Sequence, residues 1–399
     1  MTRTLSLLVF LTGCLPIGRG KPVDLPPDTY PVHHGVIVDE ELAADIDAAV
    51  LDYLYDARMP SVAVGVYGPG EVYYTGSFGW AELETARELK PHTPVLLSSV
   101  SKTFIGVAAM QGVEAGRLAL ADRVSQHTGF AVDNPRVDGE RIELIDLLTH
   151  TSGLSDSAIY GANYSEGDPV ISLRDFEEGY VTPGGRHHRR SNWSKRAPGE
   201  AYEYSNVGAG LAALAIGDAA GLAFSDLVRR DILEPLGMDD SAYFLADQTR
   251  APAIPYGRTR TRFRAWEPYG YPTYPDGMMR SGADDLARYG AAMLGGGALD
   301  GARVLSEASV ERMLRVDERI DAHGEGQAVV WVDVPLRGRT VTGHNGGDFG
   351  SFTELYMDRE AGVGFLLLFN AVPMDGDDYR AIQGLEAELL DLAESRRNR

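Results

Sequence analysis

Length, composition and charge limit what this chain can be. It has 399 residues, 44% of them hydrophobic and 24% charged, which suits a globular protein of one large two-part domain or two ordinary domains. Its formal net charge of -21 argues against binding of nucleic acid or of an anionic membrane surface through a basic patch. Its single cysteine, Cys14, excludes an intrachain disulfide.

Residues 1–14 have the pattern of an export signal. Arg3 supplies a positive start, and Leu5 to Leu11 form an apolar core that is too short to span a bilayer as a helix. The ending at Cys14 resembles the lipobox of bacterial lipoproteins, in which the cysteine is lipidated and becomes the mature N-terminus. An ordinary secretory signal with an incidental cysteine is the alternative. We expect an exported protein of the cell envelope, anchored in the membrane only through lipid on Cys14.

The next part of the chain predicts a tether, a helix and two strands. Residues 15–38 are rich in proline and glycine and lack periodicity, which suits a tether. Apolar residues at helical spacing predict an amphipathic helix from Asp39 to Arg58. Strands are predicted at Ser61–Tyr67 and Val72–Phe78, joined by a glycine-rich turn. The apolar run from Val100 to Val113 predicts a second helix.

Strands return near the C-terminus after a long helical stretch. Residues 117–240 favour helices and loops. The aromatic side chains in residues 251–275 either line the rim of a pocket or pack beneath a loop. The C-terminal region predicts four strands and a closing helix: Ala328–Val334, Thr340–Thr342, Phe352–Asp358, Val363–Asn370 and Asp377–Ser395. Strands at both chain ends predict an α+β fold, with one sheet built from both ends and a helical lobe beside it.

Ser99 and Lys102 form the only S-x-x-K in the chain, at the start of the second predicted helix. Residues three apart share one face of a helix, so the hydroxyl and the amine can meet in one pocket. A serine becomes nucleophilic when a neighbouring base takes its proton, and a lysine can be that base when burial and nearby positive charge lower its pKa. The pair predicts an acyl-transfer centre, although the same spacing also arises by chance on a solvated helix.

Tyr204 and Asn206 form the only Y-x-N. A tyrosine can relay protons if a nearby cation lowers its pKa, and Lys102 would be such a cation. The asparagine can hold a substrate amide and the lysine together. The alternative is a packed tyrosine beside a helix cap.

The segment from His344 to Gly347 lies in a predicted strand and turn. The histidine can donate a hydrogen bond to a substrate carboxylate or to the tyrosine oxygen, and the glycines allow close approach of a substrate backbone. A backbone N–H near Gly347, together with that of Ser99, predicts an oxyanion hole. The H-x-G pattern also occurs at His33 and at His127, but only His344 follows Tyr204 and has a strand context.

Other chemistries lack their sequence signatures. The chain contains no G-x-S-x-G, no H-E-x-x-H, no metal-type spacing of cysteine and histidine, and no phosphate-binding or dinucleotide glycine motif. We therefore expect neither a cofactor nor a metal. His150 and Ser152 stand together like part of a triad, but the sequence places no acid with them.

In this order, the segments Ser99–Lys102, Tyr204–Asn206 and His344–Gly346 resemble the three motifs of the class C β-lactamase-related serine hydrolases. That family includes class C β-lactamases, D-alanyl-D-alanine carboxypeptidases, D-aminopeptidases and esterases. The resemblance spans about residues 40–395. Four further segments also resemble the family: Gly116–Asp122, Leu147–Leu154, Leu233–Met238 and Ser281–Arg288.

The resemblance implies a β-lactamase/transpeptidase-like fold, an antiparallel sheet flanked by helices with a helical lobe. It implies that Ser99 is the acylated nucleophile, that Lys102 and Tyr204 share the acid/base work, and that Asn206 positions substrate and lysine. It also makes the triad-like fragment near His150 structural. The expected division of the chain is a signal at 1–14, a tether at 15–38 and a hydrolase domain at 39–396, with a sheet part at 39–125 and 270–396 and a helical lobe at 126–269.

The third motif departs from that of true class C β-lactamases, which carry K-T-G where this chain has His344, Asn345 and Gly346. By resemblance these residues and Gly347 bind substrate. A neutral histidine pairs with the carboxylate of a β-lactam less well than a lysine does.

We therefore expect a lipid-anchored serine hydrolase that forms an acyl-enzyme with peptide-like, ester or β-lactam substrates. Carboxypeptidase or esterase chemistry is favoured over that of a true β-lactamase, and the expected partner is a small-molecule or peptide substrate. The alternative is a catalytically silent binding or sensor protein on the same scaffold. Loss of a catalytic residue would mark that alternative, and none is missing.

Overall fold

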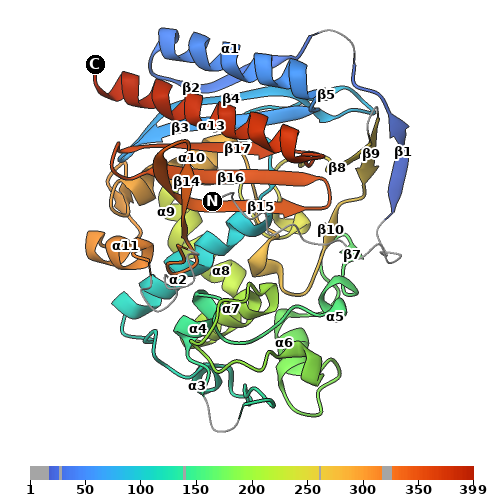
Figure 1. Ribbon diagram of the computed structural model, residues 1–399, viewed down its shortest axis with the longest axis vertical. Helices are drawn as coiled ribbons and strands as arrows, with labels where there is room; N and C mark the ends of the chain where they lie inside the picture. The colour runs from blue at the N-terminus through green and yellow to red at the C-terminus, as the bar shows by residue number, and fades with distance from the viewer. Residues whose placement is uncertain (1–17, 27–28, 138–140, 260–261, 317–325) are drawn as a thin grey trace.

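A computed structural model describes residues 18–26, 29–137, 141–259, 262–316 and 326–399. Figure 1 shows two parts, a sheet layered between helices and a helical lobe beneath it. The signal segment and Cys14 lie outside the described residues.

The main sheet is antiparallel and is built from both ends of the chain. Its strands run in the order β14-β15-β16-β17-β3-β4-β2, and β5 also pairs with β4. In that order their bounds are Val332–Leu336, Arg339–Asp348, Ser351–Asp358, Val363–Phe369, Ser61–Gly68, Glu71–Glu82, Val32–Ile37 and Arg87–Glu88. Both central strands, β17 and β3, are buried along their whole length, which explains their near-continuous apolar sequences.

Helices cover both faces of this sheet. α1 (Glu40–Ala57) and α13 (Gly376–Arg397) pack side by side on one face, and α10 (Ala283–Leu294) packs on the other (Figure 1). The N-cap of α1 is Asp39, whose carboxylate accepts the backbone N–H groups of Glu41 and Leu42. The sheet and helices thereby enclose two apolar cores, one on each face.

The helical lobe is arranged around α7 (Asn206–Ala220), whose first twelve residues are all buried. α2 (Lys102–Glu114) packs against α7 and joins the lobe to the sheet. The other helices are α3 (Val124–Thr128), α4 (Leu144–Leu148), α5 (Ala158–Gly161), α6 (Leu173–Val181), α8 (Phe224–Val228), α9 (Glu234–Leu236) and α11 (Glu307–Leu314).

Short 3-10 turns, one π turn and small strand pairs complete the described chain. The turns are η1 (Ser98–Ser101), η2 (Arg190–Asn192), the π turn η3 (Arg229–Leu233), η4 (Leu245–Asp247) and η5 (Tyr274–Asp276). The strands are β1 (Arg19–Val23), β6 (Val95–Leu96), β7 (Ser165–Glu166), β8 (Tyr256–Arg258), β9 (Phe263–Trp266), β10 (Tyr269–Gly270), β11 (Arg280–Ser281), β12 (Ala298–Leu299) and β13 (Ala302–Arg303).

The prediction of the fold class is confirmed, and two details are wrong. Residues 15–38 are not a plain tether, because β1 pairs with β9 and β2 pairs with β4 at the edge of the main sheet. The lobe does not run to residue 269 as one helical unit, because β8 and β9 form a small sheet with β1. In both places backbone pairing with distant segments, which local composition does not reveal, sets the structure.

In the part of the chain that the structure describes, no single helix is both long and apolar enough to cross a bilayer. The bent pair Asn206–Ala220 and Phe224–Leu236 meets the criteria only when its two halves are taken together.

Phe365 tests the packing of the sheet against α1 and α13. Its side chain is completely buried at the centre of β17. Phe365→Ala should lower the free energy of unfolding by about 3–5 kcal/mol, because it removes apolar contacts and leaves a cavity. Val170 is 82% exposed, and Val170→Ala should change it by less than about 0.5 kcal/mol. Urea denaturation measures both, and equal effects would contradict the assigned core.

Candidate active site

Ser99 lies in η1, the turn that leads directly into α2. The helix predicted from Val100 begins two residues later, with Ser99 in the 3-10 turn and Lys102 as the first residue of α2. The preceding residue, Ser98, has φ 49° and is buried, so the backbone bends sharply before the nucleophile. Ser99 is partly exposed, whereas Lys102 is fully buried, so the candidate nucleophile is open to solvent and the candidate base is not.

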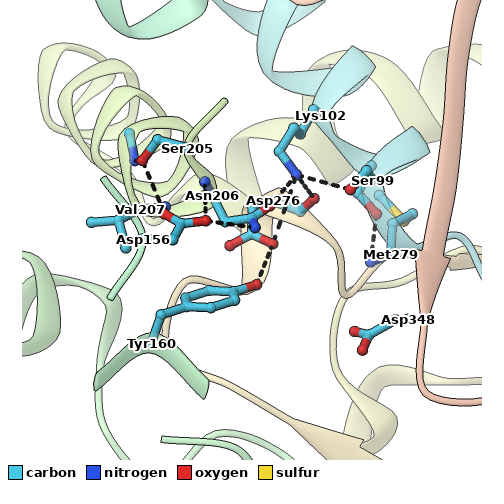
Figure 2. A network of polar contacts seen from close by, with 12 residues as sticks. Ser99, Lys102, Asp156, Tyr160, Ser205, Asn206, Val207, Asp276, Met279 and Asp348 are labelled. Atoms are coloured by element: carbon cyan, nitrogen blue, oxygen red, sulfur yellow. Dashed lines mark hydrogen bonds and ion pairs between the residues drawn. The ribbon is translucent and has the colours of Figure 1, made fainter. Parts of the chain in front are cut away.

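The amine of Lys102 has three hydrogen-bond partners. Its Nζ lies 3.1 Å from Ser99 Oγ, 2.7 Å from Asn206 Oδ1 and 2.8 Å from the backbone oxygen of Asp276. Figure 2 shows the lysine side chain pointing into the space between these three groups. Burial lowers the pKa of Lys102, while the carboxylates of Asp276, Asp156 and Asp348 act in the opposite direction. The structure thus brings the predicted nucleophile, base and asparagine together.

Tyr204 lies beside the same pair. Lys102 Nζ is 5.0 Å from the centre of the tyrosine ring, over its face, and the Ser99 hydroxyl acts on the phenol as a hydrogen-bond partner. Burial raises the pKa of Tyr204 well above its usual value. The expectation that Lys102 lowers this pKa is therefore wrong, because the amine faces the ring and desolvation dominates. Tyr204 stays a neutral phenol and can pass a proton on.

Asn206 opens α7, and Asp156 fixes its orientation. Asp156 accepts hydrogen bonds from the side-chain amide of Asn206, from the hydroxyl of Ser205 and from the backbone N–H groups of Asn206 and Val207 (Figure 2). Because the Asn206 Nδ2 donates to Asp156 at 2.8 Å, its Oδ1 is turned toward Lys102. The carboxylate also lies at the positive end of the α7 dipole.

The third predicted motif forms β15, next to the nucleophile. A Cβ on Gly346 would lie 2.8 Å from Ser99 N and 2.4 Å from Leu97 O, so only glycine lets the strand approach this closely. A Cβ on Gly347 would meet nothing within 4 Å, and this residue is exposed, so the strand has open space beside it. Asn345 pairs with Glu354 of β16 and is partly exposed.

His344 lies on the same strand and is neutral. Its Nδ1 contacts the backbone oxygen of Asn345 at 2.5 Å, and its ring centre lies 6.4 Å from that of Tyr204. Burial, followed by the positive charge of Lys102, lowers the pKa of His344 to about 4. An imidazole with this pKa carries no charge near neutral pH.

The sequence motifs leave out two residues of the site and give a third only a structural role. Asp156 and Asp276 were not singled out, because aspartates are frequent and only the fold carries these two to Lys102. The resemblance makes His150 structural, yet its ring lies against that of Tyr204 with centres 4.3 Å apart, and its Nδ1 accepts the Ser205 N–H. Its φ of 55° marks a strained turn.

The aromatic segment packs behind the site. Tyr269, Tyr271 and Tyr274 are buried, and Tyr164 contacts the first two of these rings. The hydroxyl of Tyr164 lies 3.3 Å from a carboxylate oxygen of Asp348, which is also buried. These three tyrosines therefore pack in the interior and do not line an exposed pocket rim.

A metal centre is not apparent in the described ranges. Within them, no group of three or more histidine, cysteine, aspartate or glutamate side chains is arranged to hold an ion.

The family of this chain follows from comparison with known proteins. The Beta-lactamase family model matches residues 44–388, so the chain belongs to the Beta-lactamase family. It is 30% identical over 281 residues to esterase EstB of Burkholderia gladioli, covering 62% of this chain and 69% of that protein. It is 24% identical over 257 residues to protein flp of Staphylococcus aureus strain N315, covering 61% of this chain and 47% of flp. The chain thus aligns with about half of the length of flp.

Solved structures support the same fold. D-amino acid amidase from Ochrobactrum anthropi aligns with a TM-score of 0.68 and 20% identity, over 90% of this chain and 99% of the amidase. The octameric penicillin-binding protein homologue from Pyrococcus abyssi aligns with a TM-score of 0.67 and 23% identity, over 87% of this chain and 77% of the homologue. The chain thus has the fold of these β-lactamase-related structures.

Asp156→Ala tests the fixed orientation of Asn206. Without the carboxylate the amide can rotate and present Nδ2 to Lys102, so kcat/KM for an activated ester should fall about 100-fold. Asp39→Ala is the matched control, since it also removes a carboxylate from a helix N-terminus but lies at α1. Both variants should lose about 1 kcal/mol of stability. Equal activity of the two variants would contradict the positioning role of Asp156.

Proposed function

We propose that this protein hydrolyses esters or peptide-like amides through a covalent acyl-enzyme on Ser99. The observation that carries the proposal is the contact between the partly exposed Ser99 hydroxyl and the buried Lys102 amine, at 3.1 Å. A buried amine with a lowered pKa can take the serine proton as Oγ attacks the acyl carbon.

The remaining groups complete the cycle. Tyr204 gives a proton to the leaving alcohol or amine and regains one from Lys102. A water molecule that is deprotonated by the same route then releases the acid. The Ser99 N–H and a backbone N–H near Gly347 are the proposed donors to the oxyanion. The proximity of β15 to η1 supports this assignment, because Gly346 lies against Ser99 N.

The neutral His344 favours substrates without a carboxylate at this position. A lysine here would offer a charged donor, whereas His344 with a pKa of about 4 offers a neutral ring. The similarity to esterase EstB also supports an esterase-type reaction. We therefore place ester and amide hydrolysis ahead of β-lactam hydrolysis.

We further propose that the protein acts in the cell envelope as a lipoprotein. The support is the signal-like segment from Arg3 through the apolar core to Cys14. Radiolabelled palmitate should be incorporated into the intact protein and not into Cys14→Ser. Equal labelling of the two proteins would contradict lipidation at Cys14.

Ser99→Ala tests the nucleophile. A fluorescent fluorophosphonate should label the native protein at one site and fail to label this variant, with hydrolysis reduced by about 10⁴-fold or more. Ser101→Ala is the matched control, because Ser101 is buried in the same turn and its hydroxyl accepts only the Met279 N–H among the contacts described. It should retain labelling. Labelling that survives Ser99→Ala would show that another residue is acylated.

His344→Lys tests the preference for uncharged substrates. It should raise kcat/KM for a penicillin about tenfold relative to a neutral aryl ester, since a hydrogen bond from a charged donor contributes about 1.5–3 kcal/mol. His344→Gln keeps a neutral polar side chain and should leave the ratio between the two substrates unchanged. If the lysine variant folds and its ratio equals that of the native protein, His344 does not set this preference.

A further inference from the structure

Asp276 contacts Lys102 in two different ways. Its backbone oxygen accepts a hydrogen bond from Nζ at 2.8 Å, and its Oδ1 lies 3.9 Å from the same nitrogen. The carboxylate is thus close enough to act on the charge of the amine but too far to share a hydrogen bond with it. Both side chains are almost completely buried, at 0% and 2% exposure, so little solvent screens the interaction.

The hydrogen-bond geometry defines what the amine can do. A neutral amine has two N–H donors and one lone pair. The Asn206 oxygen and the Asp276 backbone oxygen, at 2.7 and 2.8 Å, take the two donors. The lone pair is then directed at Ser99 Oγ, 3.1 Å away. When the serine proton arrives, the amine becomes a buried ammonium, whose charge needs a counter-charge.

Asp276 is the nearest carboxylate to that ammonium, and its own environment keeps it fixed. The Tyr160 hydroxyl donates to Oδ1 at 3.2 Å, and the side chain of Thr273 acts on the carboxylate as a further hydrogen-bond partner. Titratable groups from several elements face the pair and act on its charge: Asp156, Asp348, Glu177, Tyr160, Tyr204, His150 and His344. Burial raises the pKa of Glu177 and lowers those of the two histidines, so these three favour their neutral forms.

We propose that Asp276 is the positioning residue of a Ser99–Lys102–Asp276 triad, in which its backbone oxygen orients the amine and its carboxylate stabilises the ammonium formed during acylation. This inference rests on the acyl-enzyme mechanism proposed above. The role corresponds to that of the buried aspartate which orients and stabilises the base in serine–histidine–aspartate triads.

The proton balance of the step is simple. The Ser99 proton moves to Lys102 as Oγ bonds to the acyl carbon, and the electron pair of the broken bond goes to the leaving group. The leaving group takes a proton from Tyr204, and Tyr204 takes one from Lys102, which returns to the neutral amine. Asp276 exchanges no proton, and only its charge acts.

The pKa directions agree with this role. Asp276 raises the pKa of Lys102 against the larger effect of burial, and Lys102 lowers that of Asp276. Burial is the larger effect on the carboxyl too and raises the pKa of Asp276 to about 7. The two groups titrate as a coupled pair, so the acid side of the pH profile reports the charge of both groups.

Asp276→Asn tests the triad through the pH dependence of Ser99 modification. The measurement is the rate constant for labelling by a fluorophosphonate between pH 5 and 9. Loss of the negative charge lets Lys102 release its proton more easily, so the midpoint of the acid side should move down by about one pH unit or more. The plateau should fall about tenfold, because the amine is then a weaker base and its ammonium has lost its counter-charge.

Matched variants separate charge from structure. Asp276→Glu should return the midpoint toward that of the native protein. Asp285→Asn should leave both midpoint and plateau unchanged, since Asp285 is a buried aspartate that accepts a hydrogen bond from Ser241 and is not among the carboxylates that act on Lys102. If Asp276→Asn does not fold, Tyr160→Phe removes one hydrogen bond to the carboxylate and should shift the midpoint in the same direction by a smaller amount.

Each outcome separates this inference from the proposed function. A native protein that is never labelled would refute the acyl-enzyme mechanism itself. Native labelling together with a lower plateau but an unchanged midpoint in Asp276→Asn would overturn the triad alone and leave Asp276 as a structural residue. For Tyr160→Phe, an unchanged midpoint in a folded, labelled protein would do the same.

Discussion

The structure depends on a lysine amine that is held away from water. Lys102 is completely buried, and its nitrogen forms hydrogen bonds with the Ser99 hydroxyl, the Asn206 side-chain oxygen and the Asp276 backbone oxygen. A permanently charged amine is costly in such a place, so burial makes the neutral base accessible. The elements around the site all contribute to holding Lys102 Nζ in place.

Each partner comes from a different part of the chain. α2 supplies the lysine, the start of α7 supplies the asparagine, η5 supplies the backbone oxygen, and β15 closes the side next to Ser99. Asp156 connects the lobe to this arrangement, because the same carboxylate caps α7 and orients Asn206. Helix capping and catalytic positioning are therefore one interaction here, and a change that weakens the cap also disturbs the base.

Much of the fold and part of the site could be predicted from the sequence. The helix from Asp39, the strands around Ser61 and Val363 and the closing helix have strong apolar periodicity, and Ser99, Lys102 and Tyr204 stand in short motifs. The strands between Arg19 and Ile37 could not be predicted, because their partners lie far away in the sequence. The roles of Asp276 and Asp156 could not be predicted for the same reason, because aspartate is a common residue and only tertiary packing brings these two close to the site. The sign of the Tyr204 pKa shift depended on desolvation, which a motif does not encode.

The central sheet joins the beginning and the end of the region that matches the Beta-lactamase family model. β3 pairs with β17, and the Ser61 hydroxyl donates to Asn370 across 309 positions of sequence. Contacts between residues so far apart in the sequence form slowly during folding, because a long loop must be ordered first. Gly346 can reach Ser99 only after more than three hundred residues have been synthesised. A nascent chain therefore contains Ser99 long before the strand that lies beside it, and the site can be assembled only after β15 has been synthesised.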